Sequence, residues 1–151
     1  NTQHTYNRIL SQDPKLIQLL QRLGGFKYIF TNGTRLHAKC ALNSAGIATF
    51  FHGTLDRNGM SNMMKPELAT FHLMNSALVA GHTVQPNVIF LDDQLMNVKQ
   101  AKQVDWFTIW IHPNAIYRPL PHEVDLGFVN VYAALEFLIK SQVYLHSQGF
   151  D

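Results

Sequence analysis

Two adjacent aspartates, Asp92 and Asp93, are the residues of this sequence best suited to chemistry, because both follow directly on an apolar run. That run, residues 88–91, has no polar alternation and predicts a strand buried on both faces of a parallel sheet. Ligands of open α/β sheets bind at the carboxyl ends of the strands. Two like charges at such an edge are costly unless a cation or a basic side chain neutralises them. The pair therefore predicts a divalent metal site.

A hydroxyl group, a backbone turn and an ammonium group complete the candidate set. Thr31 ends a second apolar run, Asn32 and Gly33 interrupt it, and Lys65 lies in a long polar segment. Groups of these kinds suit a phosphate and its Mg²⁺ ion. In this prediction Thr31 donates a hydrogen bond to a phosphoryl oxygen and Lys65 neutralises negative charge, while the two aspartates hold the Mg²⁺.

The elements that must position these residues alternate between helix and strand. Apolar residues at helical spacing predict five helices, at residues 13–23, 34–44, 66–80, 95–104 and 131–141. Apolar and β-branched runs predict strands at residues 26–31, 87–93 and 107–112. Such alternation with short connections indicates an α/β fold, built from right-handed βαβ units around a mostly parallel sheet.

Two finer expectations follow from the same pattern. Leu36 is expected on the inward face of the second helix. Residues 52–66 are expected to form a polar loop of a length that indicates function or mobility. Met60 belongs to a methionine cluster in this loop, which is interpreted either as padding of the loop or as a partner contact.

Composition narrows the class of protein. The chain has 151 residues, 46% of them hydrophobic, which suits a single domain with an ordinary core. A net charge of +2 without a basic run argues against nucleic-acid binding. No apolar stretch approaches the roughly 20 residues of a membrane-spanning helix. The lone cysteine, Cys40, excludes an internal disulfide framework and favours an intracellular location.

The order of the candidate residues along the chain excludes two other phosphate-binding folds. A phosphate-accepting receiver domain has its acidic pair before the threonine and the lysine, whereas this chain has the order Thr31, Lys65, Asp92. A P-loop nucleotide-binding protein requires a GxxxxGK[ST] segment, and the sequence contains none.

The order Thr, Lys, Asp-Asp resembles that of the haloacid dehalogenase-like (HAD) hydrolases. KYIFTNG around Thr31, the Lys65-Pro66 pair and VIFLDD ending at Asp93 look like the second, third and fourth motifs of that superfamily. The likeness covers residues 13–138. TNGTRLHA, followed by AGI, FFHGTLD and MKPE, is most similar to the pyrimidine 5′-nucleotidase-like branch.

The resemblance implies a Rossmann-like three-layer α/β/α core with a mostly parallel sheet. It implies catalytic roles for Thr31 and Lys65 and substrate binding by both, together with Asn32 and Gly33. The two aspartates would hold Mg²⁺, and the substrate would be a small phosphorylated metabolite such as a nucleoside monophosphate.

The sequence departs from the family pattern at its beginning. The DxDx[TV] motif, which carries the family's nucleophile and its acid/base, does not occur in this chain. We therefore expect residues 1–25 to be the end of a helical cap with a lead-in helix, and residues 26–151 to be a core domain whose first strand is absent. Gln94 stands where a small serine is usual and could crowd the metal site. Asp105 replaces a common glycine, which an aspartate can do because it tolerates left-handed backbone angles.

Two hypotheses on function follow. The first is a Mg²⁺-dependent phosphohydrolase core whose nucleophile lies on sequence outside this chain. The second is a catalytically inactive HAD-like domain, a structural or interaction subunit whose partner covers the open sheet edge. In the second case no Mg²⁺-dependent hydrolysis is expected.

Overall fold

The computed structural model describes residues 12–60 and 63–149 of the chain, which form two compact units. One unit comprises Asn1–Gly59 with Leu135–Asp151, and the other comprises Met60–Ala134. Of the expected cap region, residues 1–25, the first eleven lie outside the described residues.

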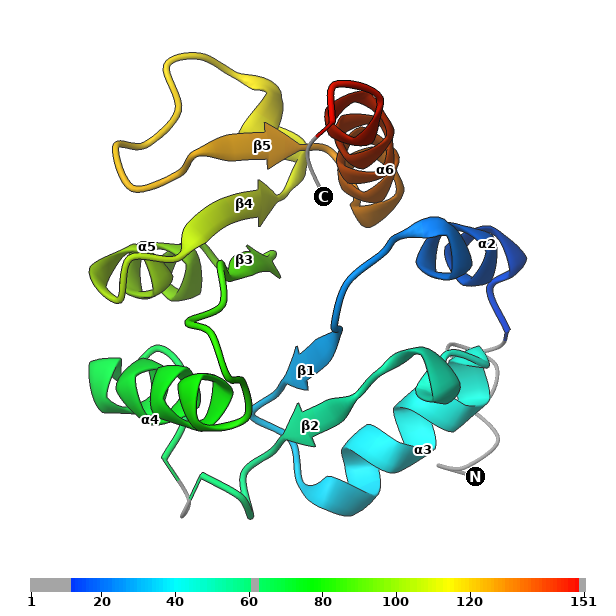
Figure 1. Cartoon of the computed structure of the whole chain (residues 1–151). Coiled ribbons are helices and arrows are strands. Elements are labelled where there is room, and N and C mark those ends of the chain that lie inside the picture. Colours follow the sequence, from blue (N-terminus) through cyan, green and yellow to red (C-terminus); the bar gives the residue numbers. More distant parts are fainter. Residues whose placement is uncertain (1–11, 61–62, 150–151) are drawn as a thin grey trace. The chain divides into compact units, whose positions relative to one another are not determined.

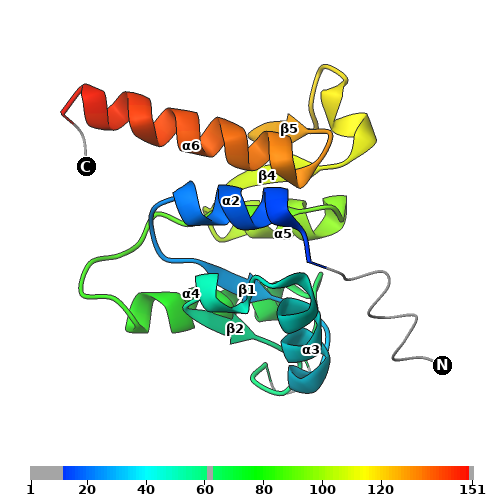
Figure 2. The same ribbon diagram turned by 90° about the vertical axis from the view of Figure 1, so that its right-hand side faces the viewer.

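The first unit pairs two short parallel strands with helices (Figure 1). Its elements are α2 (Pro14–Arg22), β1 (Tyr28–Phe30), α3 (Arg35–Ala45), a 3₁₀ turn (Ala48–Phe50), β2 (Gly53–Leu55) and most of α6 (Val131–Ser147). Strands β1 and β2 lie side by side, with Tyr28 opposite Gly53 and Phe30 opposite Leu55 (Figure 2). Strand β2 lies within the segment predicted to be a loop, so that prediction is wrong at residues 53–55.

Local signals explain where the helices of this unit begin and end. Asp13 caps α2 by accepting a hydrogen bond from the Leu16 N–H at 3.1 Å, and Pro14 occupies the first turn. Thr34 caps α3 in the same way, and Gly46 ends it with a left-handed φ of 75°. These boundaries match the predicted helices to within one residue.

Helices α2 and α6 lie side by side in this unit (Figure 2). The Gln142 side chain accepts from the Gly24 N–H at 3.0 Å and donates to the Gly24 carbonyl at 3.1 Å. Lys15 pairs with Glu136 at 3.5 Å. Helix α6 continues to Ser147, six residues beyond the predicted end. The sequence has no glycine or proline to end the helix before Gly149.

The second unit is a three-stranded parallel sheet with helices. Its elements are α4 (Leu68–Ala80), β3 (Ile89–Asp92), α5 (Leu95–Gln103), β4 (Phe107–Ile111), a 3₁₀ turn (Pro113–Ile116) and β5 (Leu126–Phe128). The strand order is β3-β4-β5, all parallel, and α5 lies beside β3 and β4 (Figure 1). The sequence did not predict β5. The predicted α/β class with parallel strands is confirmed.

Aromatic side chains build the core of the second unit. The ring centroids of Phe71, Phe90 and Trp106 lie 5.7–5.9 Å from one another. A second cluster forms around Val98 and Trp110, with Ala115 and Val124. Helix α4 reaches the core through Phe71, which is fully buried. No helix among the described residues is long and apolar enough to cross a membrane.

Several side chains differ from their predicted positions. Leu36 is 72% exposed, because the buried face of α3 is centred on Ala38 instead. Ile89 is 47% exposed, so β3 is not buried on both faces as predicted. Met60 is 1% exposed and belongs to the core, so it is not available as a partner contact. Helix α4 begins at Leu68 rather than at Pro66. Asp105 does adopt a left-handed φ, of 61°.

A charged link joins α5 to the segment before β5. Asp125 accepts hydrogen bonds from the Lys102 ammonium at 2.6 Å and from the Thr108 N–H at 2.8 Å. Burial alone would raise the pKa of Asp125, but these bonds and the Lys102 charge outweigh burial, so the pKa lies below its ordinary value. The folded unit therefore favours the ionised carboxylate.

We expect this link to make stability depend on acid pH. The unfolded chain binds the Asp125 proton at a higher pH than the folded chain, so the stabilisation is present above about pH 4 and is lost as the pH falls through the folded pKa. Urea unfolding between about pH 6 and about pH 2 should show the free energy of unfolding falling with acid. Asp125→Asn should make this fall shallower, and Lys102→Met should do so in part. An Asp125→Asn slope equal to that of the wild type would contradict the assignment.

Candidate functional site

A buried ion pair lies at the carboxyl end of β3. The Lys65 ammonium is 3.0 Å from Oδ2 of Asp92, and the two side chains are only 10% and 9% exposed. The same ammonium lies 5.7 Å from the centroid of the Phe90 ring. Strand β3 positions Asp92 at its last residue, opposite Trp110 of β4. The structure therefore brings together two of the residues that the sequence singled out.

Two further donors, Asn97 and the Gln94 N–H, complete the surroundings of Asp92. The Lys65 ammonium shares Oδ2 with the Asn97 amide, which donates at 3.2 Å. The Gln94 N–H donates to Oδ1 at 2.8 Å, at the residue that precedes α5. Asn97 is a buried polar residue. The sequence places it in the stretch that resembles the fourth motif of the HAD hydrolases, but it was not predicted as a site residue. Asp92 is thus held by donors at both of its oxygens.

Asp93 has a different environment, although it is the neighbouring residue. It is exposed, and its main-chain carbonyl accepts a hydrogen bond from the Trp110 indole at 3.0 Å. Partial burial, a hydrogen bond with Asp92 and repulsion from the Asp92 charge raise the pKa of Asp93 above its ordinary value. A cation beside Asp93 would relieve this repulsion.

The donor set around Asp93 fits Mg²⁺ rather than a fully protein-bound metal. Among residues 12–60 and 63–149, no group of three or more His, Cys, Asp or Glu side chains could hold a metal ion. Mg²⁺ keeps several waters and takes one or two protein carboxylates together with substrate phosphates. Asp93 meets that requirement with an accessible carboxylate, whereas Asp92 is already engaged with Lys65 and Asn97.

Thr31, Asn32 and Gly33 form a turn at the carboxyl end of β1, in the first unit. The Thr31 N–H donates to the Leu55 carbonyl at 2.9 Å, which continues the pairing of β1 with β2. The Thr31 hydroxyl accepts from the Gly33 N–H at 3.0 Å and closes the turn. The predicted meeting of this turn with Lys65 and the two aspartates stays a prediction.

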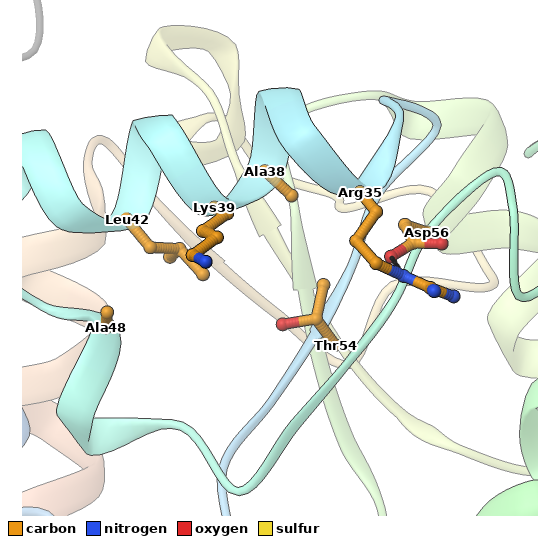
Figure 3. A pocket seen from close by; sticks show the side chains of 7 residues that line it. All are labelled: Arg35, Ala38, Lys39, Leu42, Ala48, Thr54 and Asp56. Carbon is orange, nitrogen blue, oxygen red and sulfur yellow. Dashed lines mark hydrogen bonds and ion pairs between the residues drawn. The ribbon is translucent and has the colours of Figure 1, made fainter.

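The first unit contains a pocket of about 150 Å³ (Figure 3). Its lining comes from one face of α3, from the 3₁₀ turn and from β2: Arg35, Ala38, Lys39, Leu42, Ala48, Thr54 and Asp56. Arg35 crosses the end of the pocket, where its Nε lies 3.3 Å from Oδ2 of Asp56 (Figure 3). Sequence reasoning missed Asp56, because it follows the strand that was predicted to be a loop.

Asp56 is 2% exposed and held as an anion. A hydrogen bond from the Gly59 N–H lowers its pKa, burial raises it, and the hydrogen bond and charge of Arg35 lower it further. The net effect places the pKa of Asp56 below its ordinary value.

Neither the protein-family models nor the curated proteins include a match to the sequence. Solved structures do match. A dehalogenase described with an intermediate complex aligns with a TM-score of 0.67 and 17% identity, over 84% of this chain and 56% of that one. The magnesium-bound HAD-hydrolase YfnB from Bacillus subtilis aligns with a TM-score of 0.63 and 19% identity, over 82% and 52%. A HAD phosphatase from Thermococcus onnurineus aligns with a TM-score of 0.62 and 23% identity, over 83% of this chain and 57% of that one.

These likenesses concern the fold, which agrees with the fold predicted from the sequence. The chain spans little more than half of each of these structures, between 52% and 57%. Their descriptions include both a dehalogenase and a phosphatase, so the fold alone leaves the chemistry open.

Proposed function

We propose that this chain, whose fold is that of the haloacid dehalogenase-like hydrolases, is part of the core of a Mg²⁺-dependent phosphohydrolase. Its substrate would be a small phosphate ester such as a nucleoside monophosphate. The observation that carries the proposal is the carboxyl end of β3, where Lys65 pairs with buried Asp92 while Asp93 stays accessible. Adjacent carboxylates with one accessible member suit a cation that accompanies a phosphate.

Each predicted residue has a task in this proposal. The Thr31 hydroxyl and the Asn32 N–H would bind phosphoryl oxygens, and the Gly33 N–H, which donates to the Thr31 hydroxyl, would orient that hydroxyl. Lys65 holds Asp92 in place and contributes positive charge for the transferring phosphoryl group. Asp93 would hold the Mg²⁺, which neutralises charge on the phosphate when it is bound.

None of the residues assigned above is the nucleophile. The sequence contains no DxDx[TV] segment, so the attacking carboxylate would come from a segment other than these 151 residues. Turnover is therefore proposed for a longer protein that contains this chain, with the predicted division into cap residues 1–25 and core residues 26–151.

Asp93→Asn tests the proposal in that longer protein. We expect Mg²⁺-dependent hydrolysis of nucleoside monophosphates and p-nitrophenyl phosphate to fall by about 10²–10³-fold, the usual loss when one charge-stabilising group is removed. Mg²⁺ titration by calorimetry should show the loss of binding directly. Asp105→Asn is the matched control, because it removes one carboxylate at the far end of α5 and asparagine also tolerates the left-handed φ of 61°. Unchanged hydrolysis in Asp93→Asn would refute the metal assignment.

An inactive, structural HAD-like domain is the second candidate. The observation that favours it is the saturation of Asp92 by Lys65, Gln94 and Asn97, which is what a purely structural carboxylate would show. This candidate predicts that the longer protein hydrolyses no phosphate ester with Mg²⁺, and that Asp93→Asn changes neither metal binding nor stability.

A further inference from the structure

The four-residue segment from Asp56 to Gly59 is hydrogen-bonded to the Thr31–Gly33 turn and to the residues after it. It directly follows β2 and belongs to the segment that the sequence interpreted as a functional or mobile loop. All of these residues lie in the first unit. We call residues 56–59 the brace.

Arg57 makes the direct contacts between the brace and the turn. Its main-chain N–H donates to the Gly33 carbonyl at 2.9 Å, and its side-chain Nε donates to the Asn32 carbonyl at 3.1 Å. The Asn32 and Gly33 carbonyls of the turn are thus fixed by one residue. With its carbonyls pointing at Arg57, the peptide groups of the turn keep a single orientation.

The rest of the brace is anchored at both ends. The Asn58 side chain accepts from the Arg35 N–H at 3.0 Å, which satisfies a donor at the start of α3. Oδ1 of Asp56 accepts from the Gly59 N–H at 2.9 Å, and Oδ2 of Asp56 accepts from Nε of Arg35 at 3.3 Å. The segment is therefore closed on itself and attached to α3 before Arg57 reaches the turn.

From these contacts we propose that Arg57 is the positioning residue of an anion-binding turn. By fixing the Asn32 and Gly33 carbonyls, the brace holds the turn in which the Gly33 N–H donates to the Thr31 hydroxyl and orients that hydroxyl for a phosphoryl oxygen. The inference rests on the proposed function for the anion, whereas the fixed geometry of the turn stands on the contacts alone. Arg57 acts through Asn32 by hydrogen bonding. A lysine would keep the charge but not the planar guanidinium, whose Nε–H is held in a fixed direction.

The terminal nitrogens of the Arg57 side chain contribute positive charge beside the turn. Among the residues that the structure describes, none accepts a hydrogen bond from them. Their charge therefore lies beside the turn without a carboxylate to neutralise it, in contrast to Arg35, which pairs with Asp56. The turn thus favours a ligand with more than one negative charge, such as a phosphate dianion, over a monoanion.

Two measurements on Arg57→Ala and Arg57→Lys test the inference in the 151-residue chain. Amide hydrogen exchange by NMR should become about tenfold faster at residues 32–33 in both variants, the effect of one lost hydrogen bond. The affinity for inorganic phosphate, followed by the same amide signals, should weaken about tenfold in both variants and stay weakened at high salt. Lys140→Ala is the matched control, since it removes another exposed charge from this unit and should change neither quantity.

Each outcome separates the brace from the proposed function. Unchanged exchange at residues 32–33 in Arg57→Ala overturns the brace. Full phosphate affinity in Arg57→Lys, or a loss in Arg57→Ala that disappears at high salt, shows a simple charge effect and also overturns it. If the wild-type chain binds no phosphate while exchange still accelerates in the variants, the geometry of the brace is supported and the phosphate-binding role of the turn fails.

Discussion

Replacement of Lys65 by methionine should lower the free energy of unfolding by about 3–5 kcal/mol, the usual cost of leaving a buried charge without its partner. The pair is suited to such an effect, since the two side chains are 10% and 9% exposed and their charged atoms are 3.0 Å apart. Without the ammonium, Asp92 would keep only neutral donors, from Gln94 and Asn97. Urea unfolding followed by circular dichroism measures the loss.

Two further variants decide whether the buried charge is the cause. Lys99→Met removes a lysine whose pair with Glu123 is longer, at 3.9 Å, and more exposed, so it should cost no more than about 1 kcal/mol. The double variant Lys65→Met with Asp92→Asn should be more stable than Lys65→Met alone, because it no longer buries an unpaired charge. A double variant less stable than Lys65→Met would argue against the buried-charge explanation.

Phe71→Ala should lower the free energy of unfolding by a similar amount, about 3–5 kcal/mol, through the cavity that it leaves. Phe71 is fully buried, and its ring contacts both Phe90 and Trp106. Because Phe90 belongs to β3, the cavity would also loosen the strand that ends at Asp92. Thermal and urea unfolding of the variant measure the effect.

Leu73→Ala provides the control on the same helix. Leu73 lies two residues further along α4 and is 36% exposed, so its truncation should cost about 1 kcal/mol or less. Equal losses in the two variants would mean that helix propensity or global fraying, rather than core packing, dominates the response of α4.

The sequence predicted long, strongly patterned elements well and short ones poorly. Asp13 with Pro14, and Thr34 with Gly46, marked helix boundaries that the structure confirms. Strands β2 and β5 have three residues each and both contain a glycine, so neither shows a strand pattern of its own. They form because β1, which is more apolar, pairs with β2, and β4, which is longer, pairs with β5. Strand pairing between distant segments cannot be read from the local sequence of β2 or β5.

The sequence predicted the candidate residues by type and order, but it did not predict which of the two aspartates is buried and which is exposed. Asp92 and Asp93 are identical in the sequence, yet one is held by Lys65 and the other is exposed. Strand β3 ends at Asp92, so Asp93 lies outside the strand and the adjacent carboxylates do not share an environment. The contact of Asn97 with Asp92 and the contact of Arg57 with Asn32 were not predicted, because each forms only when a helix or a turn folds. The pairing of Thr31 with the two aspartates stays a prediction.

The hydrogen bond from Trp110 to the main chain at Asp93 has an experimental consequence. The chain has two tryptophans, and the other, Trp106, donates to Asn75 at 2.9 Å within the aromatic core. Indole fluorescence responds to nearby charge and to the hydrogen bond that its N–H donates. Trp110 donates to the Asp93 carbonyl at 3.0 Å and stacks on His112 at 5.0 Å. With Trp106 replaced by phenylalanine, the protein would carry a single tryptophan, hydrogen-bonded to the residue that bears the Asp93 carboxylate, and its emission would report on any cation bound there.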